Sequence, residues 1–166
     1  MSRFPNHRLV ALLAVLFSAA TLSFGGGHPP RIAPAKGEKI AFARTYSKDY
    51  LKNHPLQMVT KTSLVLKNTK GLLTAEWKTT IRDIRTDELV ALSATGICKA
   101  RNPRRLECNY DASTGLVELF AQPDGIYVSI PVGQGVLLSA EKDGMVRSEL
   151  LLGADDANNA YRLYRK

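Results

Sequence analysis

The chain has 166 residues, and its 23 Lys and Arg against 15 Asp and Glu give a formal net charge of +8. No segment recurs with a period of roughly 20–50 residues, which excludes a solenoid or another repeat array. The two cysteines are too few for a metal site without further ligands beside them. A chain of this length without repeats predicts one folded domain.

The first 24 residues have the pattern of a secretory signal peptide. Arg3 and Arg8 make the start positive, and residues 9–24 then form an apolar run. That run is shorter than a membrane span of about 20 strongly apolar residues, and small polar residues interrupt it. Ser18-Ala19-Ala20 supplies small residues for cleavage, which we place between 20 and 27. The alternative is an uncleaved anchor formed by one helix.

We therefore predict an exported chain, periplasmic or secreted, with three parts. Residues 1–24 form the signal peptide, residues 25–40 a flexible tether and residues 41–166 a single β domain. The tether is predicted because the stretch after the leader is rich in Gly and Pro and has no alternating pattern. Removing the leader takes two cations and no acid, so the mature chain carries 21 − 15 = +6.

One short helix is predicted over residues 47–53, where Ser47 can cap the start and Pro55 disfavours helix at His54. From Met58 onward, Gly, Pro and Asn recur about every ten residues, as in the turns of β-hairpins. The segments between these turns are the predicted strands, about eight or nine in number. They cover residues 58–67, 72–82, 88–98, 105–110, 116–121, 125–130, 135–141, 146–152 and 160–164.

Alternation along these segments indicates antiparallel strands with one buried face. The clearest example has its apolar and small residues on one face and its polar residues on the other. The expected inward residues are Leu73, Ala75, Trp77, Thr79 and Ile81. The predicted fold class is mostly β, an antiparallel meander that forms a sandwich or an up-and-down barrel, with one short N-terminal helix.

Cys98 and Cys108 are predicted to form a disulfide, because an even pair in an exported chain favours a bridge. The bridge would join neighbouring strands, with its Cα atoms about 4.4–6.8 Å apart. The alternative is two reduced, buried thiols.

The most distinctive surface feature is the basic hairpin between the two cysteines. Its four cations fall within seven residues around Asn102-Pro103, and they are Lys99, Arg101, Arg104 and Arg105. Arginine binds carboxylates and phosphates through paired hydrogen bonds, so we predict these four as binding residues for an anionic envelope component or an acidic protein. The alternative is a solvated tip that discourages aggregation. Nucleic acid is not predicted, because the chain is exported and no aromatic platform accompanies the cations; membrane contact is peripheral at most.

No catalytic set, metal cluster or nucleotide loop stands out, so no enzyme, cofactor or metal is predicted. His54 has no nucleophile and orienting acid beside it in the sequence, and a contact with Asp155-Asp156 would tie down a terminus. The aromatic residues are expected to pack in the core or in hairpins rather than to form a ligand cage. They include Tyr46, Tyr50, Trp77, Phe120 and Tyr127.

Three stretches carry a resemblance to a known family. The first is R-x-Y-x4-L-x2-H-P-x-Q-x-V-T from Arg44 to Thr60. The second joins Gly96-Ile97-Cys98 to Leu106-Glu107-Cys108 and Asp111, and the third joins Gly153-Ala154-Asp155-Asp156 to Tyr161-Arg162-Leu163. Over about residues 44–163 the chain resembles a family of small secreted alphaproteobacterial proteins with no assigned function. The resemblance implies export, a β fold and the disulfide, and it implies no activity. Members usually carry further cysteines, one of them where this chain has Ala43.

These observations leave ranked hypotheses for function. The first is a non-enzymatic exported domain, in the envelope or secreted, that binds an anionic or protein partner through its surface. The alternative is a small-ligand carrier with an apolar barrel cavity, and an uncharacterised hydrolase using His54 ranks last. An internal cavity of several hundred cubic ångströms would favour the carrier, whereas a filled interior would favour surface binding. The sequence does not predict an oligomeric state.

The leader makes a direct prediction. Sequencing of the N-terminus of the exported protein should begin between Thr21 and His28, because charge, run length and small residues agree on cleavage there. Recovery of a membrane-bound product that retains Met1 would contradict it.

Overall fold

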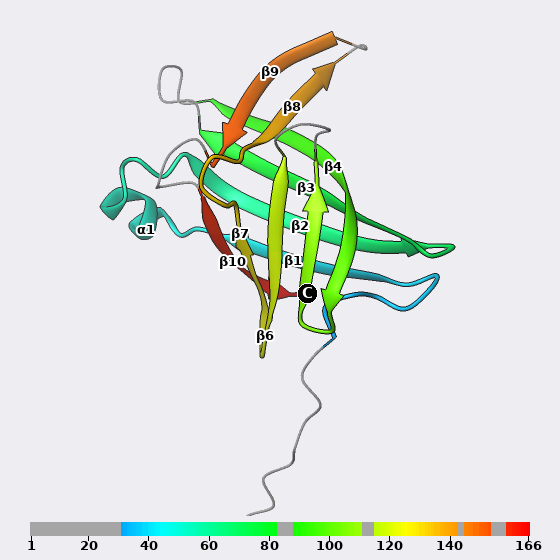
Figure 1. Cartoon of the computed structure of the whole chain (residues 1–166). Coiled ribbons are helices and arrows are strands. Elements are labelled where there is room, and N and C mark those ends of the chain that lie inside the picture. The colour runs from blue at the N-terminus through cyan, green and yellow to red at the C-terminus, as the bar shows by residue number, and fades with distance from the viewer. Residues whose placement is uncertain (1–30, 83–87, 111–114, 143–144, 154–158) are drawn as a thin grey trace, which may run out of the picture.

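A computed structural model of the chain describes residues 31–82, 88–110, 115–142, 145–153 and 159–166, and Figure 1 shows it as a cartoon. The predicted signal peptide, residues 1–24, lies outside the described residues, so the leader stays a prediction.

Within these ranges the structure has ten strands and one helix, α1 (Lys48–Asn53). The strands are β1 (Lys39–Thr45), β2 (Val59–Thr69), β3 (Leu72–Arg82), β4 (Leu89–Asn102), β5 (Arg105–Asn109), β6 (Leu116–Gln122), β7 (Gly125–Ser129), β8 (Val136–Lys142), β9 (Met145–Leu152) and β10 (Ala160–Arg165). Each of the nine predicted strands corresponds to one of β2 to β10. The largest difference is at β4, which continues four residues past its predicted end at 98. Much of the basic hairpin is therefore strand rather than loop.

Eight of the strands close into an antiparallel barrel. They follow the order β1-β2-β3-β4-β5-β6-β7-β10, and β10 pairs again with β1. The hairpin of β8 and β9 is inserted between β7 and β10, touches β4 through the pair Ser93 and Ser139, and projects beyond the barrel (Figure 1). The prediction of a mostly β antiparallel meander is confirmed, and of the two architectures left open the fold is the barrel.

The N-terminal part of the barrel differs from the prediction. The stretch 25–40 was expected to be a flexible tether, yet its described part, from residue 31, packs on the barrel and continues into β1. Ile32 is only 2% exposed, and its backbone N–H donates to the Pro103 carbonyl at 3.2 Å. The Gly37 N–H donates to the Asn68 carbonyl at 2.8 Å. The tether prediction is wrong for residues 31–40, because burial of one isoleucine and backbone bonds to two hairpins fix a segment whose composition resembles a linker.

Side chains fill the middle of the barrel around Trp77. The five residues predicted to face inward from β3 are all buried. The Trp77 indole N–H donates to the Thr62 hydroxyl at 2.8 Å, and that hydroxyl lies 3.1 Å from the Thr79 hydroxyl. The rings of Tyr110 and Tyr161 meet the indole edge-on, with centroids 5.9 and 5.6 Å away. Leucines of β2, β5, β6 and β10 complete this level, so the interior is a packed core here: Leu64, Leu66, Leu106, Leu119 and Leu163.

The predicted helix is present and begins one residue after its predicted cap. The Ser47 hydroxyl accepts a hydrogen bond from the Tyr50 N–H at 3.1 Å, which satisfies one of the free donors at the helix start. The helix ends before His54-Pro55, as expected. In the ranges given above, the structure has no helix with the length and hydropathy needed to cross a membrane.

The Thr62 hydroxyl links Trp77 to Thr79, and this makes a prediction for stability. Thr62→Val keeps the volume but leaves the indole N–H and one hydroxyl without their partner inside the barrel. We expect the free energy of unfolding to fall by about 1–3 kcal/mol. Urea titration followed by Trp77 fluorescence measures it. Thr74→Val on the outer face of β3 is the control, with an expected change within about 0.5 kcal/mol. Equal stability of the two variants would contradict the prediction.

Candidate binding surface at the basic hairpin

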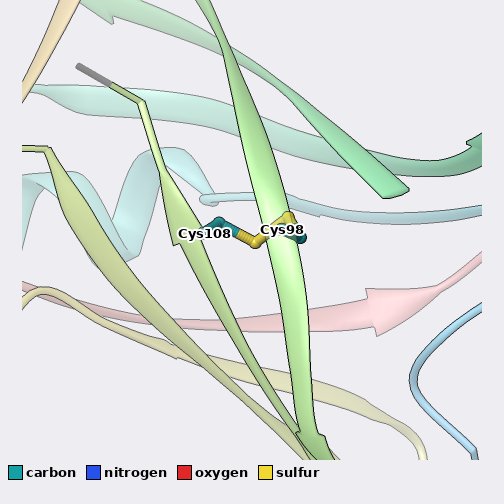
Figure 2. The surroundings of a disulfide bond; sticks show 2 residues. All are labelled: Cys98 and Cys108. Carbon is teal, nitrogen blue, oxygen red and sulfur yellow. A yellow bond between two sulfur atoms is a disulfide. The ribbon is translucent and has the colours of Figure 1, made fainter. Parts of the chain in front are cut away.

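The basic hairpin consists of the end of β4 and the start of β5, and the predicted disulfide closes it. Cys98 lies directly opposite Cys108 across the two strands, and their sulfurs are bonded (Figure 2). The Cα atoms are 3.9 Å apart, closer than the predicted range of about 4.4–6.8 Å. Both side chains are buried and face the barrel interior. The pairing is confirmed.

Backbone hydrogen bonds hold the hairpin tip from both sides. The Asn102 side-chain oxygen accepts the Arg104 N–H at 2.8 Å and so shapes the turn. On one side the Pro103 carbonyl accepts from Ile32, and on the other the Arg104 carbonyl accepts the Ala121 N–H of β6 at 2.8 Å. The tip therefore has a defined position between the N-terminal segment and the β6–β7 hairpin.

Acids on the same outer face pair with two of the four predicted cations. The Arg101 guanidinium forms an ion pair with Glu107, and Arg105 forms one with Glu118 and a longer one, at 3.4 Å, with Glu107. The hydrogen bond from Arg101 holds the pKa of the Glu107 carboxyl below its ordinary value, and the same bond raises the pKa of Arg101. These two arginines are partly neutralised within the barrel surface.

The other two predicted cations are placed differently. Lys99 lies directly opposite Glu107 in the ladder, so its charge adds to the field on that carboxylate. Arg104 is exposed at the turn and makes no ion pair with any carboxylate of the described residues. The structure brings the four cations together on one hairpin, and Arg104 is the one of them at the turn, away from Glu107 and Glu118 in the strand register.

A groove of about 770 Å³ runs along one side of the tip. Its lining combines the turn with the outer faces of β6 and β7, and consists of Asn102, Pro103, Arg104, Arg105, Phe120, Ala121, Gln122 and Tyr127. The Arg105 guanidinium lies over the Phe120 ring, 5.5 Å from its centroid, and the Tyr127 ring is 6.4 Å from that of Phe120. The groove thus presents cations beside two aromatic rings.

A second groove, of about 610 Å³, lies on the other side of Asn102-Pro103. The N-terminal segment and the end of β10 form its far wall. Two more cations, Arg31 and Arg165, belong to this wall, and Glu38 is its one acid. Asn102 and Pro103 therefore separate the two grooves, and Arg104 lines the first of them.

Four residues of this surface were not predicted as binding residues. Phe120 and Tyr127 were expected to pack in the core or in hairpins, and they pair across the β6–β7 hairpin on its outer face, where Tyr127 is 40% exposed. In the alternating pattern of β7, Tyr127 falls on the face away from the barrel interior, so the sequence already indicated that its ring is exposed. Arg31 and Arg165 carried no local signal, because only closure of the barrel brings the two ends of the chain to the hairpin.

His54 and the arginine motif form a separate cluster at α1. The His54 ring stacks on Tyr50 with centroids 4.0 Å apart, and its Nδ1–H donates to the Tyr50 carbonyl at 2.8 Å. The Arg44 guanidinium lies over Tyr46 and Tyr50, 4.5 and 5.6 Å from their centroids. These contacts are structural, since they attach α1 to the barrel. The predicted contact with Asp155-Asp156 lies outside the described residues.

No group of three or more His, Cys, Asp or Glu that could hold a metal ion occurs in the part of the chain that the structure describes. Comparison with known proteins gives no match to a family model, a curated protein or a solved structure. The interpretation of this surface therefore rests on its own geometry.

The disulfide beneath the tip makes a prediction for stability. Reduction should lower the free energy of unfolding by roughly 2–3 kcal/mol, because it frees a loop of about ten residues in the unfolded chain. Denaturant titrations with and without dithiothreitol measure the loss. The Cys98→Ala, Cys108→Ala double variant is the control and should not respond to the reductant. A wild-type curve that reductant leaves unchanged would contradict the prediction.

Proposed function

We propose that this chain is an exported, non-enzymatic domain that binds an anionic partner through the surface around the basic hairpin. The observation that carries the proposal is Arg104: its side chain is exposed, makes no ion pair within the described residues, and lines the groove beside Phe120 and Tyr127. An arginine in this position can bind a carboxylate or a phosphate through two parallel hydrogen bonds.

The groove beside Arg104 also favours a ligand with an apolar part. Phe120 and Tyr127 offer ring faces next to the cations, and Tyr127 adds a hydroxyl. Glu107 and Glu118 limit the local positive charge, since they occupy Arg101 and Arg105. The chemistry supported best is an anionic group carried on a partly apolar body, which fits a lipid headgroup or an acidic segment of a protein.

The packed interior supports surface binding over the carrier hypothesis. Trp77, Tyr161 and the leucines around them occupy the middle of the barrel, and the two grooves at the hairpin lie outside it. A barrel of about eight strands is just wide enough for side chains to fill it. The His54 ring is engaged by Tyr50, which supports a structural role over a hydrolytic one.

The disulfide supports export. Bridges of this kind persist in oxidising compartments such as the periplasm or the outside of the cell. With the predicted leader, it favours the envelope or the medium as the place where the partner is met.

Two matched pairs of single-charge variants test the surface. On a phosphocellulose column, Arg104→Gln should elute at lower salt than Lys48→Gln, which removes one exposed cation from α1 instead. Glu107→Gln should elute at higher salt than Asp49→Asn, because it frees Arg101 and relieves Arg105. Each change should alter affinity by up to about fivefold at low salt, the range expected for exposed charges.

The matched pairs separate local binding from net charge. Both members of a pair carry the same formal charge, so a nonspecific ion-exchange effect would make them elute together. Co-elution of both pairs would overturn the proposal that the hairpin is the binding surface.

A further inference from the structure

A group of exposed cations lies at one end of the barrel, which we call the basic end. It is the end at which β1 begins, β10 ends and the β2–β3, β4–β5 and β6–β7 turns lie (Figure 1). Seven exposed cations there make no ion pair with a carboxylate of the described residues: Arg31, Lys36, Lys39, Lys70, Arg104, Arg165 and Lys166.

The described acids Glu38 and Asp124 bring two negative charges to the basic end, fewer than its seven cations. Asp124 is engaged by Arg162, with oxygen–nitrogen distances of 3.0 and 3.1 Å. The Glu38 carboxylate accepts the Ala35 N–H at 3.2 Å. Lys39 lies directly opposite Lys67, a like-charge pair of the kind that destabilises a ladder unless an anion is near. Lys67 has Glu76 at 2.9 Å, and Lys39 has no such partner within the described residues.

The N-terminal chain enters the barrel at the basic end. Ile32 is inserted there, and Arg31 is the first described residue. The seven residues from the end of the predicted leader at 24 to Arg31 can span at most about 25 Å when fully extended. While the predicted leader is in a membrane and uncleaved, it keeps Arg31 at the basic end within about 25 Å of the leader's end.

We infer that the basic end is a docking surface for an anionic lipid bilayer, on which the barrel stands with its axis away from the membrane. The inference rests on the proposed function and names its partner. The cations come from the β2–β3 and β4–β5 turns and from both ends of the described chain, and so surround the end instead of converging on one pocket. Such a spread matches a laterally continuous layer of phosphate groups better than a single acidic segment. Leu72, Tyr127 and Tyr164, each at least 40% exposed near this end, suit the interface between headgroups and water.

Vesicle sedimentation tests the inference. The exported protein should bind vesicles of phosphatidylcholine with about 30% phosphatidylglycerol and should not bind vesicles of phosphatidylcholine alone. Binding should weaken between low salt and about 0.15 M salt, where screening acts over roughly 8 Å. Each cation close to an anionic surface contributes about fivefold in affinity. The triple variant Arg31→Gln, Arg104→Gln, Arg165→Gln should therefore bind at least about tenfold more weakly than the parent.

Two further triple variants test whether vesicle binding depends on the basic end as a whole. Lys36→Gln, Lys39→Gln, Lys70→Gln uses other cations of the basic end and should weaken binding to a similar extent. Lys48→Gln, Lys52→Gln, Lys61→Gln removes the same charge from α1 and the adjacent start of β2, and should change binding by less than about threefold if charges beyond the screening length contribute little. The near-UV circular dichroism of buried Trp77 verifies that each variant is folded.

Each outcome bears on the inference. No binding to the anionic vesicles at low salt, or equal loss in all three variants, would overturn it. If the protein does not bind the anionic vesicles but the variants of each matched pair still elute at different salt concentrations from phosphocellulose, the proposed function stands. The partner is then an acidic protein rather than a membrane. If only the Arg31, Arg104 and Arg165 variant weakens, one pocket binds the lipid and the inference of a whole docking end is wrong.

Discussion

Closure of the barrel between its first and last strands is the constraint on which the basic end depends. Phe42 pairs with Arg165 and Ala43 with Tyr164, and these contacts bring the end of β10 beside the start of the fold. β10 also pairs with β7. Gly125 of β7 lets the two strands come close, because a Cβ at this position would collide with the Leu163 backbone oxygen. Without this closure, Arg165 would be far from the β4–β5 hairpin and the second groove would lose its far wall.

The packed interior of this small domain provides its stability, and the charged end carries the residues proposed for binding. Apolar burial around Trp77, together with a hydroxyl network that satisfies its indole, stabilises the barrel without help from the surface charges. The turns can then carry cations, because exposed ion pairs contribute little to stability and their loss costs little. The residues proposed for binding therefore lie almost entirely outside the core, and their substitution should report on binding rather than on folding.

Local signals predicted most of the fold, and non-local pairing accounts for what they missed. Alternation and turn residues located nine strands, and Ser47 with Pro55 bounded the helix. β1 was missed because it follows a Gly- and Pro-rich stretch, and because Arg44 replaces an apolar residue on its inward face. The choice between sandwich and barrel depends on β1 meeting β10, which no local pattern encodes. The four hairpin cations were found from spacing, whereas their acids on β5 and β6 required the strand register.

Three interactions hold the basic hairpin beside the cations of the basic end: the Cys98–Cys108 disulfide, the backbone bond from Ile32 to Pro103, and the backbone bond from Ala121 to Arg104. Cations concentrated at one end oppose its compact form, and this opposition grows as salt is removed. A covalent link between β4 and β5, and backbone bonds from two neighbouring segments, hold the Arg104 turn against it. An anionic surface would relieve the same repulsion from outside. Stability and binding are then coupled, because a partner that binds only the closed barrel also stabilises it by mass action.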